Sequence, residues 1–129
     1  MTEQREIVRA HCLRRLDREA TVHPADHQTT KAARYLLPRE GRMSAPLMIE
    51  KEAGKAFNIW CRRADLDERE LAGIAHRPSS PAGSTGGRPG RHSALTTMSD
   101  MARADLWCIA PETVGEVDRV LDAICGKSP

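Results

Sequence analysis

The strongest limit on the fold of this chain comes from residues 77–92, whose sequence is RPSSPAGSTGGRPGRH. Four glycines and three prolines leave no run that could present a hydrophobic face to a core, so we expect neither helix nor strand here. The same segment holds three arginines and no acidic residue. It predicts a mobile, cationic loop that stays outside the core and is available to contact a partner.

The length of the chain favours a single domain over residues 1–129, large enough to bury a core without disulfides or metal. Aromatic residues make up only 3% of the chain, so the core must be built mainly from aliphatic side chains. That scarcity argues against proteins that stack single-stranded bases on several exposed aromatic rings. No run of about 18 apolar residues is present, so we expect no membrane-spanning helix.

Charge is distributed unevenly along the sequence, although its formal net value is only +2. Residues 1–42 hold nine Lys and Arg against six Asp and Glu, and residues 77–103 hold four against one, so each region carries +3. Residues 104–129 hold two against five and carry −3. This pattern describes either an ordinary solvated surface or a basic region that meets an anionic partner, with an acidic region available to a basic one.

The four cysteines, Cys12, Cys61, Cys108 and Cys125, are widely spaced and form no Cys-x-x-Cys pair. The N-terminus lacks the apolar stretch of a signal peptide. These two features predict a cytoplasmic protein with reduced thiols. The sequence holds no complete cofactor motif, so we expect no cofactor.

Two helices are predicted in the N-terminal third of the chain. Residues 3–20 place Val8 and Cys12 four positions apart on an apolar stripe, as in an amphipathic helix. The other side of this helix is cationic and carries His11, Arg14, Arg15 and Arg18. A proline in its first turn suits a second helix over residues 24–37, which Pro38 would end. We therefore expect a helical hairpin.

The rest of the chain is expected to supply a small sheet. Apolar runs at residues 47–49 and 56–61 predict a β-hairpin, and residues 65–75 predict a short helix. The clearest pattern is C-terminal, with a strand over 105–109 and a helix over 111–126. The predicted fold class is α+β: a three-stranded sheet, its last two strands parallel, packed against the helical hairpin and the C-terminal helix.

Residues 87–91, Gly-Arg-Pro-Gly-Arg, resemble the Gly-Arg-Pro core of the AT-hook. In that motif an extended arginine lies along the narrow, electronegative minor groove of A·T-rich DNA. AT-hooks usually carry a second arginine directly before the first glycine, where this chain has Gly86, although Arg91 lies nearby. The resemblance implies DNA contact by a few residues of the loop. The alternatives are a plain flexible linker and a loop that orders on a protein.

Other binding motifs are incomplete. Residues 83–87 could cradle a phosphate, but no Lys-Ser/Thr pair follows the glycines. Residues 66–75 look like the first helix of a helix-turn-helix, but the prolines that follow would break a recognition helix. His23 and His27 could share a helical face and bind metal, but two ligands do not make a zinc site. We therefore expect neither a nucleotide cradle nor a metal site.

Side chains that could support catalysis flank the basic segment in the sequence. His76, His92, Ser93 and Asp100 could supply a base, a nucleophile and an orienting carboxylate if the fold brought them within hydrogen-bond distance. Nothing in their spacing requires that arrangement. A small hydrolase or nuclease around His76 and His92 is therefore one alternative function.

The sequence favours a non-enzymatic binding protein that acts on nucleic acid or on a nucleoprotein machine, with a steep salt dependence of binding. The expected partner is DNA, RNA or a protein of such a complex. The expected contacts are basic residues of the Gly/Pro-rich segment and the first helix, namely Arg77, Arg88, Arg91, His92, Arg14, Arg15 and Arg18. Another alternative is a protein–protein adaptor or inhibitor of such a machine. It would use the exposed side of the predicted β-hairpin or acidic residues of the C-terminal helix, namely Glu112, Glu116, Asp118 and Asp122.

Overall fold

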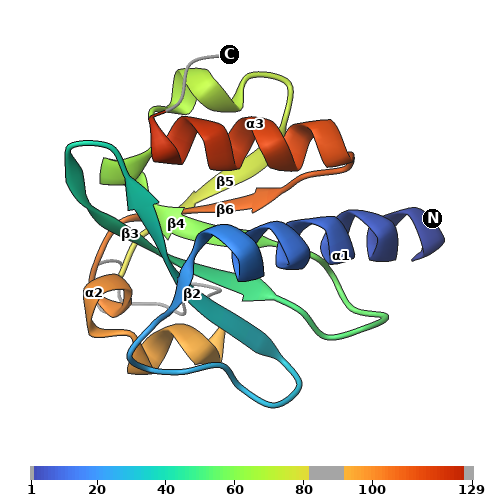
Figure 1. Cartoon of the computed structure of the whole chain (residues 1–129), viewed down its shortest axis with the longest axis horizontal. Coiled ribbons are helices and arrows are strands. Elements are labelled where there is room, and N and C mark those ends of the chain that lie inside the picture. The colour runs from blue at the N-terminus through green and yellow to red at the C-terminus, as the bar shows by residue number, and fades with distance from the viewer. Residues whose placement is uncertain (1, 82–91, 127–129) are drawn as a thin grey trace.

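The described residues form a six-stranded antiparallel sheet with helical elements on both faces (Figure 1). A computed structural model describes residues 2–81 and 92–126. The strands are β1 (Thr21–Val22), β2 (Ala32–Arg39), β3 (Arg42–Glu50), β4 (Ile59–Arg62), β5 (Ala75–Ser79) and β6 (Leu106–Ala110). The helices are α1 (Thr2–Glu19), α2 (Ser99–Ala102) and α3 (Val114–Cys125), and the short 3-10 helices are η1 (Arg63–Asp65), η2 (Glu68–Leu71) and η3 (Ser93–Thr97). The spatial order of the strands is β1-β2-β3-β4-β6-β5. The predicted α+β class is confirmed.

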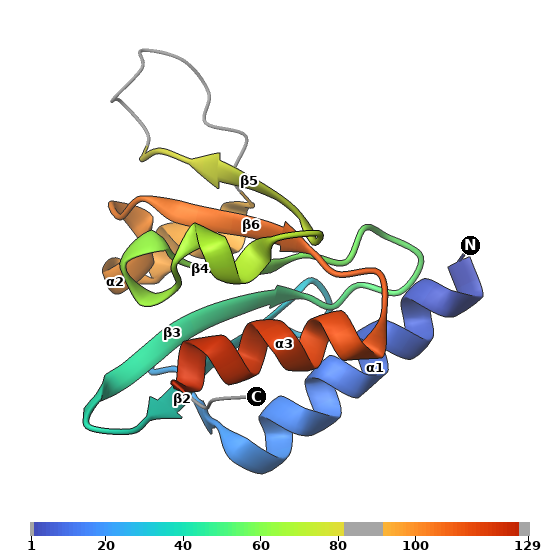
Figure 2. The same ribbon diagram turned by 90° about the horizontal axis from the view of Figure 1, so that it is seen from above.

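Helices α1 and α3 lie side by side on one face of the sheet (Figure 2). As predicted, α1 buries its apolar stripe, and α3 buries residues that recur every three or four positions. These side chains join inward-facing residues of β2, β3, β4 and β6 in the larger core cluster. The helical contributors are Val8, Cys12, Leu16, Val117, Val120, Leu121, Ile124 and Cys125.

The C-terminal strand and helix are present as predicted, except that α3 begins three residues later than expected. The hydroxyl of Thr113 accepts a hydrogen bond from the backbone N–H of Glu116 at 3.0 Å and caps the helix start. Gly126 ends the helix in the left-handed region, with φ 83°, a conformation that favours glycine. Both boundaries therefore follow from local sequence.

The opposite face of the sheet is covered by η3 and α2. Leu95, Met98 and Met101 from this cover pack on Met48 of β3 and Trp60 of β4 in a second core cluster. All five side chains are at most 1% exposed. Both faces of the central strands are therefore buried, which explains why their sequences are continuous apolar runs rather than clean alternations.

The second predicted helix is wrong, because the later part of residues 24–37 belongs to strand β2. Ala33 and Tyr35 face the core under α1, whereas Ala32 and Arg34 are buried on the other face. Pairing with β3 along almost the whole strand supplies backbone hydrogen bonds that outweigh the modest helix preference of these alanines and leucines. The predicted helical hairpin does not exist, and α1 is followed by strands.

Pro38 does not end a helix either. It lies within β2, where the β2–β3 register shifts between Leu37 and Arg39. An irregularity of this kind tolerates a residue without a backbone N–H, which a regular ladder does not.

The predicted three-stranded sheet is too small, because β1, β2 and β5 also join the sheet. The last two strands of that prediction, β4 and β6, are antiparallel rather than parallel. Between them, residues 65–75 form no continuous helix: η2 is followed by Gly73 at φ 82°, and the chain then extends into β5. Residues 77–79, predicted to begin a loop, are part of that strand. None of the helices among the described residues combines the length and the apolarity needed to cross a membrane.

Candidate nucleic-acid interface

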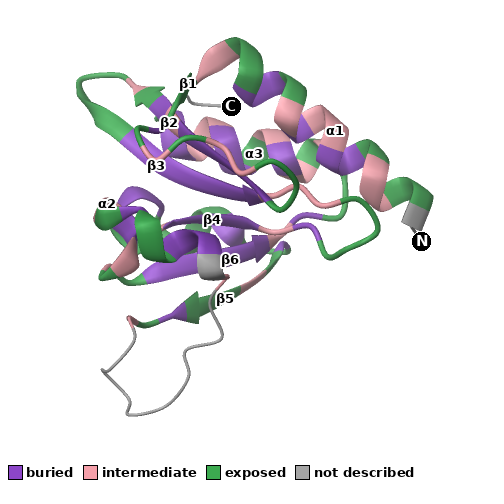
Figure 3. Cartoon of the chain, turned by 90° about the horizontal axis from the view of Figure 1, so that it is seen from below, coloured by how far each residue is buried: buried purple, intermediate pink, exposed green. Residues whose placement is uncertain are grey.

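Strand β5 forms one border of the sheet, with β6 as its neighbour (Figure 3). Ala75, Arg77 and Pro78 on this strand are exposed. Pro78 has no backbone N–H, so this border is a poor template for a further strand. A partner that meets β5 is therefore expected to contact its side chains rather than extend the sheet.

Arg77 is held against an aromatic ring. The central carbon of its guanidinium lies 5.4 Å from the centre of the Trp60 ring. Trp60 is 1% exposed, and its Nε1 donates a hydrogen bond to Oε2 of Glu50 at 2.8 Å. The same oxygen accepts a hydrogen bond from Nδ2 of Asn58 at 2.9 Å. The ring is thus fixed, and the guanidinium that lies over it is positioned before any partner arrives.

Two further basic side chains, Arg63 and His76, contact the ring of Trp107 in β6. The central guanidinium carbon of Arg63 lies 4.6 Å from the centre of the Trp107 ring. The His76 ring meets Trp107 edge-on, with ring centres 5.3 Å apart and an interplanar angle of 84°. Nε1 of Trp107 donates a hydrogen bond to the carbonyl oxygen of Leu66 at 2.9 Å, which fixes this ring too. Sequence reasoning missed Arg63, because only the fold brings it to Trp107.

The environment of His76 favours its charged form. Nδ1 lies 2.7 Å from the carbonyl oxygen of Ile74, and Nε2 lies 3.1 Å from Oε2 of Glu68. The backbone hydrogen bond to Ile74 is the largest influence and raises the pKa of His76, partial burial opposes it, and the Glu68 carboxylate raises it further. His76 therefore keeps its proton to a higher pH than an unperturbed histidine.

The other predicted contacts near β5 lie on the segment that follows it. Arg88 and Arg91, with the residues that resemble an AT-hook, are outside the described residues. His92, where the described chain resumes, caps η3: its Nδ1 accepts a hydrogen bond from the backbone N–H of Ala94 at 3.0 Å. From residue 75 to residue 99 the sequence contains no Asp or Glu. The basic segment, residues 77–92, therefore has no acidic residue directly before or after it in the sequence.

The predicted arginines of α1 do not share a surface with β5. Helix α1 packs near β2, at the other side of the molecule from β5 (Figures 2 and 3). Arg15 is only 7% exposed, and its guanidinium donates hydrogen bonds to the carboxylates of Glu19, Asp118 and Asp122. It ties α1 to α3. Arg14 and Arg18 are exposed, the latter with 68% of its side chain accessible.

The acidic residues of α3 that an adaptor would use are partly engaged within the protein. His11 and Arg15 of α1 both contact Oδ1 of Asp118, at 2.9 and 3.0 Å. Burial alone would raise the pKa of Asp118, but the hydrogen bonds from His11 and Arg15 outweigh it and hold the pKa below its usual value. Asp122 contacts Arg15 as well, and Glu116 accepts a hydrogen bond from the backbone N–H of Glu112 at 2.8 Å.

The three described side chains among those proposed for catalysis contact different partners. Asp100 contacts the buried His23, whose Nε2 lies 3.0 Å from Oδ2 of Asp100, whereas His76 contacts Glu68. His92 caps η3, and nothing is described of the Ser93 side chain. The described contacts do not gather His76, His92 and Asp100 into one catalytic group.

His23 and His27 lie in the connection between β1 and β2, not on a helix. Nδ1 of His23 accepts the backbone N–H of Ala25 at 2.9 Å, and Nδ1 of His27 accepts the backbone N–H of Arg34 at 2.9 Å. Within residues 2–81 and 92–126 no three His, Cys, Asp or Glu side chains are grouped so that they could hold a metal ion. These histidines stabilise the connection that they belong to.

The chain matches no protein-family model, no curated protein and no solved structure. The assignment of a function therefore depends on the residues themselves.

Proposed function

We propose that this chain is a non-enzymatic binding protein that contacts the phosphates of a nucleic acid, free or in a nucleoprotein complex, through the β5 surface. We define the β5 surface as Arg63, His76 and Arg77 together with the basic segment that continues from β5. The observation that carries the proposal is the position of the Arg77 guanidinium over the fixed ring of Trp60, at the point where the basic segment leaves the sheet.

Pre-orientation of these cations suits phosphate binding. A free arginine side chain loses rotamer entropy when it is immobilised on a ligand, at about 0.5–1.5 kcal/mol for a flexible side chain. The guanidinium groups of Arg63 and Arg77 already lie over tryptophan rings, so part of that entropy is lost on folding instead. A guanidinium can also donate two parallel hydrogen bonds to one phosphate.

The charges around β5 also favour an anionic polymer over a small anion. His76 and Arg77 are adjacent in sequence but contact different tryptophans, and their cross-strand partners, Ile109 and Cys108, belong to different core clusters. Cationic groups therefore lie on both sides of one exposed strand. A chain of phosphates that runs past the sheet border can meet both, whereas a single phosphate cannot.

The test is fluorescence anisotropy with labelled duplex DNA, single-stranded DNA and RNA at several salt concentrations. On duplex DNA each phosphate contact contributes about −0.9 to the slope of log K against log salt. We expect Arg77→Ala and Arg63→Ala each to weaken binding and to make that negative slope shallower by about 1. Arg77→Lys should keep the slope but bind more weakly than the wild type, because lysine keeps the charge but lacks the planar guanidinium that can donate two parallel hydrogen bonds to one phosphate.

Arg42→Ala is the matched control, because Arg42 is an exposed arginine at the start of β3, remote from β5 in the sheet order. It should leave binding unchanged. If none of the three nucleic acids binds at low salt, or if the Arg63 and Arg77 variants bind like the control variant, the proposal is wrong.

The state of the cysteines supports a reducing compartment, and we include a cytoplasmic location in the proposal. All four cysteines are buried free thiols. Free thiols are the usual state of cysteine in the cytosol, whereas oxidising compartments favour disulfides.

A further inference from the structure

A shallow groove of about 460 Å³ runs along α1 and is lined by Glu3, Glu6, Ile7, Ala10 and Arg14. The side chain of Ala10 is much shorter than those of its neighbours, which leaves a hollow on the helix surface. Ile7 is 51% exposed, so the groove contains a large apolar side chain that the fold leaves in water. By itself an exposed apolar residue indicates little, so the residues around Ile7 decide what the groove can bind.

Four of these residues, Glu3, Ile7, Ala10 and Arg14, form a symmetric pattern that we call the outer stripe. Glu3 precedes Ile7 by four positions, and Arg14 follows Ala10 by four. Ile7 and Ala10 are three positions apart. Alternating steps of three and four keep residues on one side of a helix, and they are the spacing at which two helices pack side by side. The outer stripe is therefore suited to contact another helix.

The charged ends of the outer stripe are not paired within the described part of the chain. Glu3 and Arg14 are exposed, and neither side chain makes a hydrogen bond or ion pair with a described residue. They are eleven positions apart, or about 17 Å along the helix, so they cannot pair with each other. A second outer stripe that runs antiparallel brings opposite charges together at both ends, whereas a parallel one brings like charges together.

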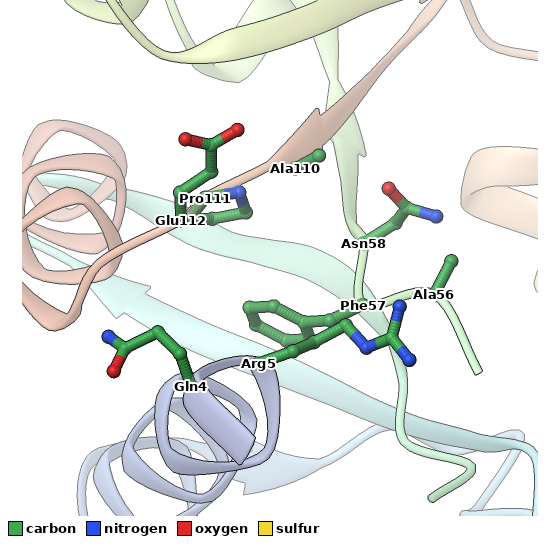
Figure 4. Close-up of a pocket in the computed structure, with 8 residues that line it drawn as sticks. All are labelled: Gln4, Arg5, Ala56, Phe57, Asn58, Ala110, Pro111 and Glu112. Carbon is green, nitrogen blue, oxygen red and sulfur yellow. The ribbon is translucent and has the colours of Figure 1, made fainter. Parts of the chain in front are cut away.

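The first turns of α1 are fixed to the rest of the protein on the inner side of the helix. Figure 4 shows the Arg5 side chain leaving α1 next to the Phe57 ring. A terminal nitrogen of Arg5 donates a hydrogen bond to the carbonyl oxygen of Gly54 at 3.2 Å. Arg9, one turn further along, donates to two carbonyl oxygens of the same loop, residues 52–55. A partner that meets the outer stripe therefore meets a helix that is already formed, and little ordering entropy is lost on binding.

We propose that two copies of this chain form a symmetric dimer through α1, with their outer stripes antiparallel. Ile7 of each copy fills the hollow at Ala10 of the other, as a knob fills a hole in a coiled coil. Glu3 of each copy pairs with Arg14 of the other, once at each end of the interface. A two-fold axis passes between the two stripes at their midpoint, so the same surface serves both copies.

A nucleic acid and a membrane fit the groove less well. Glu3 and Glu6 would repel the phosphates of either one, and a single large apolar side chain buries too little area to anchor a helix in lipid. The dimer leaves the β5 surface of each copy accessible, because α1 lies at the other side of the molecule from β5 (Figures 2 and 3). This inference therefore does not depend on the proposed function.

The test is sedimentation equilibrium of the full chain at low salt. Four side chains per copy bury less than the roughly 1,200–2,000 Å² of a stable complex, so we expect a weak dimer with a dissociation constant between about 10 and about 500 μM. The apparent mass should rise from 14.3 kDa toward twice that value as the concentration approaches about 1 mM. Salt at about 0.5 M should weaken association at least threefold, because it screens the exposed ion pairs.

Charge reversal tests the pairing of Glu3 with Arg14. Glu3→Arg alone and Arg14→Glu alone each put like charges together at both ends of the interface, and each should weaken association at least tenfold. An equimolar mixture of these two variants should form a heterodimer, and the variant with both substitutions should associate like the wild type. Glu40→Arg and Arg42→Glu are the matched controls, since both residues are exposed at the β2–β3 turn, and both variants should dimerise like the wild type.

Ile7→Gln tests the apolar contact and should weaken association at least fivefold. Met43→Gln is its control, because Met43 is an apolar residue of β3 that is 85% exposed, and this variant should not change association. Circular dichroism of each variant at low concentration checks that α1 remains folded. Three results would overturn the inference: a monomer at about 1 mM in low salt, single charge variants that associate like the wild type, or a mixture of the two charge variants that stays monomeric.

Discussion

Arg34 of β2 donates a buried hydrogen bond from Nη1 to the carbonyl oxygen of Ala94 in η3, at 3.0 Å and 60 residues along the chain. The same guanidinium donates to the carbonyl oxygens of Ala25 and Asp26 and to the hydroxyl of Thr97. One side chain therefore joins β2, the β1–β2 connection and the cover on the second face of the sheet. Arg34 is 6% exposed, so these contacts are shielded from water.

Arg34→Lys should destabilise the fold by about 3 kcal/mol, because a single ammonium cannot reach all four acceptors and a hydrogen bond to a charged group contributes about 1.5–3 kcal/mol. The measurement is the free energy of unfolding in urea. Arg42→Lys, at an exposed arginine of β3, should change it by no more than about 0.5 kcal/mol. An Arg34→Lys effect no larger than that of Arg42→Lys would show that the hydrogen bonds of the Arg34 guanidinium do not stabilise the fold.

His76 should make nucleic-acid binding depend on pH. Its pKa is raised above 6.5, chiefly by the hydrogen bond to Ile74 and also by Glu68. Nucleic acid binds the folded protein, so the contribution of this positive charge is complete well below the raised pKa of folded His76 and is lost as the pH rises through it. We expect binding to weaken several-fold between about pH 6 and about pH 8, in the range where histidine titrates.

His76→Gln should flatten that pH profile and bind as the wild type does at the high-pH end. Anisotropy titrations at constant ionic strength would show this. A profile of the same steepness in His76→Gln would assign the titration to another group.

The contact between α1 and α3 should weaken in acid. The pKa of Asp118 is lowered from 3.8, since the hydrogen bonds from His11 and Arg15 outweigh the effect of burial. The stability from this contact is therefore present above about pH 4, the unfolded value, and is lost as the pH falls through the lower folded value. Asp118→Asn should be less stable than the wild type at neutral pH, and the difference should shrink in acid, as followed by thermal unfolding.

Arg15→Met should lower the free energy of unfolding by about 1–2 kcal/mol, less than for a fully buried ion pair, because Asp118 and Asp122 are 41% and 42% exposed. Urea unfolding measures the change. Arg14→Met removes an exposed arginine one position away and should have little effect. Equal effects of the two substitutions would contradict the role of Arg15 as the link between the helices.

The core thiols should be unreactive in the folded protein. Burial raises the pKa of Cys12 to about 12 and that of Cys108 to about 11, and it raises the pKa of Cys61 as well. Because the thiolate is the reactive form, a disulfide reagent at neutral pH should label these three cysteines only as fast as the protein unfolds. In guanidinium all four cysteines should react at once. Rapid labelling of Cys12, Cys61 or Cys108 in the native state would contradict their placement.

The elements that sequence reasoning predicted well are those that depend on local patterns. Helix α1 has a regular apolar stripe, and α3 is bounded by Thr113 and Gly126, whose roles can be read within a few residues. Strand β2 has no such local pattern, since it is buried on both faces and begins with two alanines. Its conformation depends on β3 and on Arg34, whose acceptors include residues far along the chain.

In the candidate site, too, local sequence predicted some features, whereas others depend on tertiary contacts. The basic character of residues 77–92 was evident in the sequence, and Arg77 is exposed on the border strand. Whether an arginine is accessible to a partner is set by tertiary contacts. Arg15 is buried and bonded to Asp118 of α3, whereas its neighbour Arg14 is exposed. Arg63 and Trp107 are 44 positions apart, and no local pattern links them.

Pro78 has a consequence for the protein at high concentration. Open sheets can associate border to border, and long, flat borders are where fibrils and exchanged dimers begin. Here one border strand, β5, contains a proline, and the other, β1, is two residues long. Two copies that meet along β1 or β5 can form few consecutive backbone hydrogen bonds. The two border strands therefore disfavour association of one sheet with another.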